Sequence, residues 1–83
     1  MTKRAPAPPL TARQREILQC IVTFFDERGH SPSMRDIQDA TGISSTSVVA
    51  HHLAVVEAHG YLRRTPGIPR SIVLLPAALR VTR

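Results

Sequence analysis

The stretch from Gly42 to Leu53 constrains the fold most, because it ends one helix and starts another within three or four residues. Gly42 suits the left-handed residue that follows a helix. A cluster of hydroxyl side chains then offers N-caps for the next helix, namely Ser44, Ser45, Thr46 and Ser47. Two helices joined so tightly are typical of a helix-turn-helix, although helical hairpins of many functions share this pattern.

The second helix of this pair has two distinct faces at about 100° per residue. One face carries Val49, His52, Leu53 and Val56, and the opposite face carries Ser47, Ala50, His51 and Ala54. The first face predicts a buried stripe, with His52 as a partly buried structural residue. The second face is small, polar and uncharged, whereas a solvated helix face usually carries Glu and Lys. Short side chains at a helix N-terminus can reach base edges in a DNA major groove, so this face indicates DNA reading.

Two helices are predicted before Gly42. Thr11 and Gln14 form a capping box that begins a helix ending at Gly29, and Ser33 with Asp36 repeats the pattern ahead of a shorter helix. The first helix carries a core stripe of Ile17, Leu18, Ile21, Val22 and Phe25. Cys20 lies beside that stripe and is interpreted as a small hydrophobic residue, since no second thiol accompanies it.

A β-hairpin is predicted after Gly60, with strands over 61–64 and 70–75 and a turn over 65–69. Alternation points Leu62, Ile72 and Leu74 inward and leaves Arg64 and Arg70 beside the turn. A hairpin alone is marginal in water, so it must pack on the helices. It can act as a lid on the core, as a wing along a phosphate backbone, or as both.

The charge distribution favours a polyanionic partner. The net charge is +5; residues 1–9 carry two basic groups, 10–60 carry four against all six acids, and 61–83 carry five arginines and no acid. A basic solvated tail without a nucleic-acid role is the alternative.

The predicted organisation is a flexible, basic, Pro-rich arm over 1–9, one domain over 10–75 and a short C-terminal tail over 76–83, either a helical turn or unstructured. The single cysteine and the lack of a long apolar run favour a cytoplasmic, nucleoid-associated protein without a membrane.

Several segments together resemble the amino-terminal DNA-binding domain of the LexA family of SOS-response repressors. They are Leu10–Gln14, Gly29–Ile37, Gly42–Leu53 and Gly60–Arg64, followed by Pro69 and Arg70. The resemblance runs from Leu10 to about Leu75. It implies a mainly α, three-helix winged helix-turn-helix with a small β-hairpin, which binds a palindromic double-stranded operator as a dimer and reads it with the third helix.

The resemblance also implies which positions touch DNA. By position, base contacts in the major groove fall to Ser45, Ser47, Val48, Ala50 and His51. Val48 could contact a thymine methyl or merely pack at the edge of the helix, and His51 could bind a base or phosphate or be simply solvated.

Phosphate contacts are predicted around that helix for Arg13, Ser33, Arg35, Arg64 and Arg70. Five such contacts predict a log-log salt slope of roughly −4 per subunit.

The chain also departs from the family. Ala58-His59 and Gly67-Ile68 replace positions that are often basic, which predicts weaker binding per subunit. No Ala-Gly pair occurs and Lys3 is the only lysine, so the family's Ser-Lys self-cleavage is not expected of this chain. No enzyme activity, cofactor or metal site is expected. The function predicted is a LexA-like repressor without a protease domain, pairing on DNA as a homodimer or with a partner protein; the alternative is a winged-helix protein-interaction module that does not bind DNA.

Overall fold

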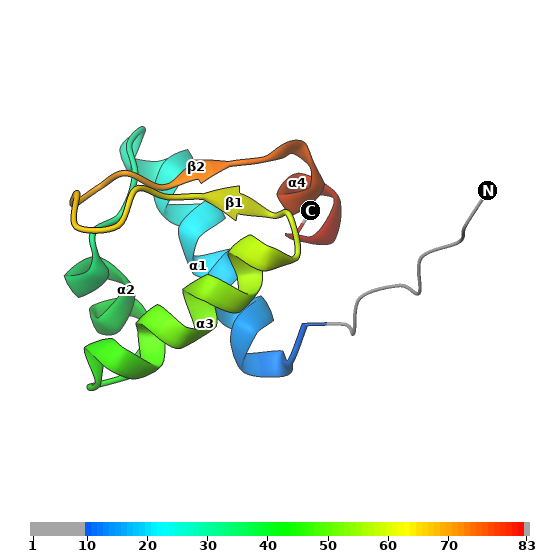
Figure 1. The fold of residues 1–83 in the computed structure, drawn as a ribbon. Helices are drawn as coiled ribbons and strands as arrows, with labels where there is room; N and C mark the ends of the chain where they lie inside the picture. Colours follow the sequence, from blue (N-terminus) through cyan, green and yellow to red (C-terminus); the bar gives the residue numbers. More distant parts are fainter. Residues whose placement is uncertain (1–9, 83) are drawn as a thin grey trace.

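The computed structural model describes residues 10–82 of the 83-residue chain. It contains helices α1 (Ala12–Arg28), α2 (Met34–Thr41), α3 (Thr46–Ala58) and α4 (Pro76–Thr82), and strands β1 (Leu62–Arg63) and β2 (Val73–Leu74). The predicted class, mainly α with a small β-hairpin, is confirmed, and α4 adds a fourth helix. Figure 1 shows the turn of the hairpin on the α2 side of the molecule and α4 at the opposite end. The predicted arm over 1–9 lies outside the described residues.

The helix ends follow the predicted capping chemistry. Thr11 accepts the Gln14 amide and Gln14 reaches back to the Thr11 amide, while Ser33 and Asp36 form the same reciprocal box on α2. Gly42 follows α2 with φ of 76°, in the left-handed region that only glycine adopts without strain. The two boxes set where α1 and α2 start, and Gly42 sets where α2 stops.

One hydrophobic core holds the helices and the hairpin together. The face of α1 predicted to be buried contributes Ile17, Leu18 and Ile21, all fully buried, and α2 contributes Ile37. Ile43, 7% exposed, fills the core between α2 and α3. α1 packs against α2, α3 and α4, so it is the central element of the domain.

The hairpin is less regular than predicted. Its ladder pairs only Leu62 with Leu74 and Arg63 with Val73, whereas the predicted strands covered 61–64 and 70–75. The missing ladder bonds are replaced by side-chain bonds: Ser71 Oγ binds the Thr65 backbone, and the Ile72 amide donates to Ser31 Oγ at 3.1 Å. The predicted inward residues are confirmed, since Leu62 and Ile72 are buried and Leu74 packs against the core.

The segment from Pro76 to Thr82, expected as a helical turn or as unstructured chain, is the helix α4. Its Ala78 is fully buried in the core, and the helix packs against α1. Within residues 10–82 no helix is both long enough and apolar enough to cross a lipid bilayer.

Candidate nucleic-acid interface

The outer face of α3 is open to solvent at its N-terminal end. Ser45, Ser47, Val48 and His51 are exposed, with Val48 at 43%, and Ala50 is half-buried. Ser45 is the N-cap and its hydroxyl accepts the Val48 amide at 3.3 Å. The sequence thus places hydroxyl, imidazole and methyl groups together on the first two turns of one helix.

The inner face of α3 fixes how the helix is rotated. Val49, Leu53 and Val56 are buried at 0–2% exposure, as predicted. His52 is half-buried, and its Nδ1 lies 3.4 Å from the side-chain nitrogen of Gln14 at the start of α1. Because one stripe is locked into the core, the exposed face of α3 has one orientation only.

This exposed face carries no acidic side chain that would repel DNA. From Ser44 to Val56 the sequence has neither Asp nor Glu. The next acid, Glu57, is bound by Arg64 Nε at 3.3 Å from its Oε1. The hydroxyl-rich end of α3 is therefore open to an anionic surface.

The predicted phosphate residues differ in how free their charges are. Arg13 pairs with Glu16 at 2.6 Å and Arg35 with Asp39 at 3.5 Å, both on the surface, and the Arg35 side chain is 83% exposed. The Arg64 side chain is only 21% exposed and is held against α3 by Glu57. Surface pairs of this kind are weak, so Arg13 and Arg35 can exchange a carboxylate for a phosphate at little cost.

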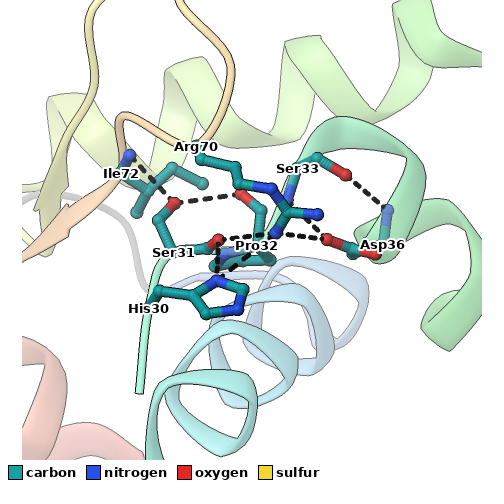
Figure 2. A network of polar contacts seen from close by, with 7 residues as sticks. All are labelled: His30, Ser31, Pro32, Ser33, Asp36, Arg70 and Ile72. Atoms are coloured by element: carbon teal, nitrogen blue, oxygen red, sulfur yellow. Dashed lines mark hydrogen bonds and ion pairs between the residues drawn. The ribbon is translucent and has the colours of Figure 1, made fainter. Parts of the chain in front are cut away.

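Ser33 and Arg70 belong to one polar network at the start of α2 (Figure 2). Arg70 Nη1 lies 3.0 Å from Asp36 Oδ2 and donates to the Ser31 carbonyl at 3.1 Å. The same Asp36 oxygen accepts the Ser33 amide at 2.9 Å. The hydrogen bond from the Ser33 backbone, together with the Arg70 charge, holds the pKa of the Asp36 carboxyl below its ordinary value.

The sequence did not single out Arg63 as a candidate site residue, and it did not predict the contact between Asp36 and Arg70. Arg63, on β1, is exposed and forms no ion pair within the described part of the chain. Asp36 was predicted only as a capping residue, and its pairing with Arg70 joins residues 34 positions apart in the sequence. Alternation along β1 points Arg63 outward and could have found it, whereas no local signal predicts the contact between Asp36 and Arg70.

Cys20 fits its interpretation as a small hydrophobic residue. Burial, with Glu16 and Asp36 nearby, raises the pKa of its thiol, so the neutral form is favoured.

Comparison with known proteins finds close sequence relatives. A family model described as the LexA DNA binding domain matches residues 7–71. The "LexA repressor 2" of Nocardia farcinica (strain IFM 10152) is 54% identical over 63 residues, which cover 76% of this chain and 26% of that protein. The "LexA repressor" of Frankia alni (strain DSM 45986 / CECT 9034 / ACN14a) is 49% identical over 71 residues, covering 86% of this chain and 28% of that protein. The chain thus spans about a quarter of the length of these curated relatives.

A solved structure shares the fold. The chain named "Crystal structure of a hypothetical protein at 2.2 A resolution" aligns with a TM-score of 0.76 and 23% identity, over 89% of this chain and 23% of that chain. At this identity the likeness concerns the fold alone.

Proposed function

Because the chain belongs to the LexA DNA-binding domain family, we propose that it binds double-stranded DNA sequence-specifically and represses transcription. The observation that carries this proposal is the outer face of α3, which is exposed, small and free of acids over its first turns. A repressor of this kind would belong to the SOS response, as the family name implies.

In this proposal the exposed turns of α3 enter the major groove and read bases. The Ser45 and Ser47 hydroxyls donate and accept hydrogen bonds, and His51 bonds a base edge one turn further along. The Val48 side chain and the Ala50 methyl offer apolar contact to a thymine methyl. A good bidentate pair between a side chain and a base contributes about 1–3 kcal/mol of discrimination, and each of these single contacts is expected to contribute less.

Phosphates on either side of the groove bind the basic groups that surround α3. Arg13 and Ser33 lie at the starts of α1 and α2, where backbone amides and the helix dipole add to the attraction. Arg35 is the most exposed of the arginines in ion pairs, and Arg64 lies where β1 leads into the wing turn. These contacts set the register on the duplex and carry no sequence information of their own.

One domain of this size covers one half-site. Specific repression therefore needs two copies on a palindromic operator, or a partner protein, with half-sites roughly one helical turn apart. Pairing on DNA raises the overall affinity without any new base contact.

Selection from a pool of randomised duplex DNA tests the proposal. The chain is incubated with the pool at about 0.1 M salt, and bound duplexes are amplified and sequenced over several rounds. We expect an enriched motif with two-fold symmetry, because two copies read two half-sites. An unenriched pool, with no retention of duplex even at low salt, would instead support the protein-interaction module.

A further inference from the structure

Arg70 links the wing turn, residues 65–69, to the segment that connects α1 to α2. Its Nη1 lies 3.0 Å from Asp36 Oδ2, 3.1 Å from the Ser31 carbonyl and 3.4 Å from His30 Nδ1. Two residues later the buried Ile72 amide donates to Ser31 Oγ, whose hydrogen bonds in turn to the Pro32 carbonyl at 2.9 Å. Figure 2 shows these contacts converging on the segment that connects α1 to α2.

The rest of the turn has little packing of its own. Thr65 to Pro69 are exposed, and Ile68 is 58% exposed although it is apolar. A groove of about 360 Å³ separates this turn from Met34 and Leu53 beneath it. The turn therefore spans a gap, and its direction depends on how its two ends are held.

The backbone of Arg70 supports the same role for its side chain. Its φ of 56° makes it the one non-glycine residue with positive φ among residues 10–82. Residues other than glycine, asparagine and aspartate rarely adopt this region, and they persist there when surrounding contacts require it. Here those contacts are the bonds of the guanidinium to Asp36 and Ser31.

We propose that Arg70 is a positioning residue: its pairing with Asp36 and Ser31 locks the wing over the start of α2, so that the wing meets the duplex beside α3. This inference rests on the proposed DNA binding and replaces the predicted phosphate role of Arg70. According to this inference, an acidic residue, Asp36, is required for binding to DNA. Asp36 serves the interface by holding the wing, although its own charge opposes DNA.

The two roles of Arg70 predict opposite effects of Asp36→Asn. If Arg70 binds a phosphate, removing its competing carboxylate frees the guanidinium and tightens DNA binding. If Arg70 locks the wing, the same change releases the wing and weakens binding. Asparagine keeps an oxygen that can accept the Ser33 amide, so the cap of α2 is largely retained. We expect roughly two- to fivefold weaker binding, the size of a lost, partly exposed ion pair.

Two variants separate the lock from charge and from capping. Asp39→Asn removes the same charge from the exposed side of α2 and should leave affinity unchanged or slightly higher. Asp36→Glu keeps both the charge and the capping-box acceptor and should restore most of the binding. Affinities are measured by fluorescence anisotropy on the selected duplex, well below the melting temperature of every variant.

Hydrogen exchange in the free protein tests without DNA whether Arg70 locks the wing. Asp36→Asn should speed hydrogen exchange at the Ile72 amide severalfold more than at Ile21 in α1, because the Ile72 amide bonds to Ser31 within the network. Equal or tighter DNA binding by Asp36→Asn, or unchanged Ile72 exchange, would overturn the lock. If the wild-type chain bound no DNA, the proposed function would fail, whereas the exchange experiment would still test the lock.

Discussion

Gly42 shows how a single residue fixes the relation between α2 and α3. Its φ of 76° lies in the left-handed region, and a Cβ built there would meet no atom within 4 Å. The requirement for glycine is therefore one of backbone conformation and involves no shortage of space.

We expect Gly42→Ala to lower the free energy of unfolding by about 1–2 kcal/mol, the cost of the left-handed region for an L-residue. Urea unfolding measures this difference. A D-alanine at the same position, introduced by chemical synthesis, favours that region and should restore stability. Equal stability of the glycine and L-alanine proteins would contradict this interpretation of the turn.

Asp36 gives the domain a defined dependence on pH. Its pKa lies below the ordinary value of 3.8 in the folded chain, so folding is favoured by its charged form. This contribution is complete above the unfolded pKa and is lost as the pH falls through the lower folded pKa.

The stability of Asp36→Asn should therefore fall less than that of the wild type between pH 6 and pH 3. Urea unfolding at several pH values in this range provides the measurement. If the two proteins lost stability in parallel on acidification, Asp36 would not be the group responsible.

At the scale of elements, local chemistry predicted the helices and long-range contacts decided the hairpin. The boxes of Thr11 with Gln14 and of Ser33 with Asp36 span three residues each, so the sequence suffices to place the helix starts. The wing depends on Arg70 meeting Asp36, 34 residues earlier, and on Ser31 taking the Ile72 amide. No spacing rule covers such contacts, which explains why the predicted strands were too long.

In the candidate site, too, local pattern predicted some features and long-range contacts decided others. Helical periodicity turned Ser47 and His51 outward, and both are exposed. Charge and position at a helix start or in the wing selected the arginines, and neither could show that Arg64 is held by Glu57. The DNA contacts of all these residues stay predictions.

Substitutions at the N-cap of α3 separate an effect on stability from an effect on DNA binding. Ser45 both caps the helix and lies at the proposed interface. Ser45→Asp keeps a side-chain oxygen for the Val48 amide and favours the positive end of the helix dipole, so stability should be retained or rise slightly. The added negative charge should weaken binding to every duplex by at least about tenfold.

Ser45→Asn is the matched neutral control, because it also caps the helix. It should retain stability and most non-specific affinity. Thermal unfolding and anisotropy titrations measure the two properties. Undiminished DNA binding by the Asp variant would place the N-terminus of α3 away from the duplex.

For the whole molecule, the proposed function implies that DNA binds at one end of the domain, where α2 and the N-terminus of α3 lie. Arg35, on α2, is proposed to bind a phosphate, and Arg80, also exposed, lies on α4 at the opposite end of the molecule (Figure 1). The two side chains carry equal charge and lie at different ends of the molecule, and Arg35 also pairs with Asp39 on α2.

Arg35→Gln should therefore lower the magnitude of the log-log salt slope by about 0.9 and weaken binding about equally on all sequences. Arg80→Gln should leave the slope unchanged. Titrations between about 50 and 200 mM salt give both slopes. Equal effects of the two substitutions would indicate attraction by net charge, without an oriented interface.

If the exposed turns of α3 read the bases, changing their side chains must change the motif that the protein selects. Motif selection from randomised duplexes is carried out in parallel with the wild-type chain and with Val48→Ser and His51→Ala variants. We predict that each variant selects a motif altered at one or two base pairs of each half-site, with the remaining positions and the spacing preserved. Identical motifs from all three proteins would mean that these turns of α3 do not read the bases.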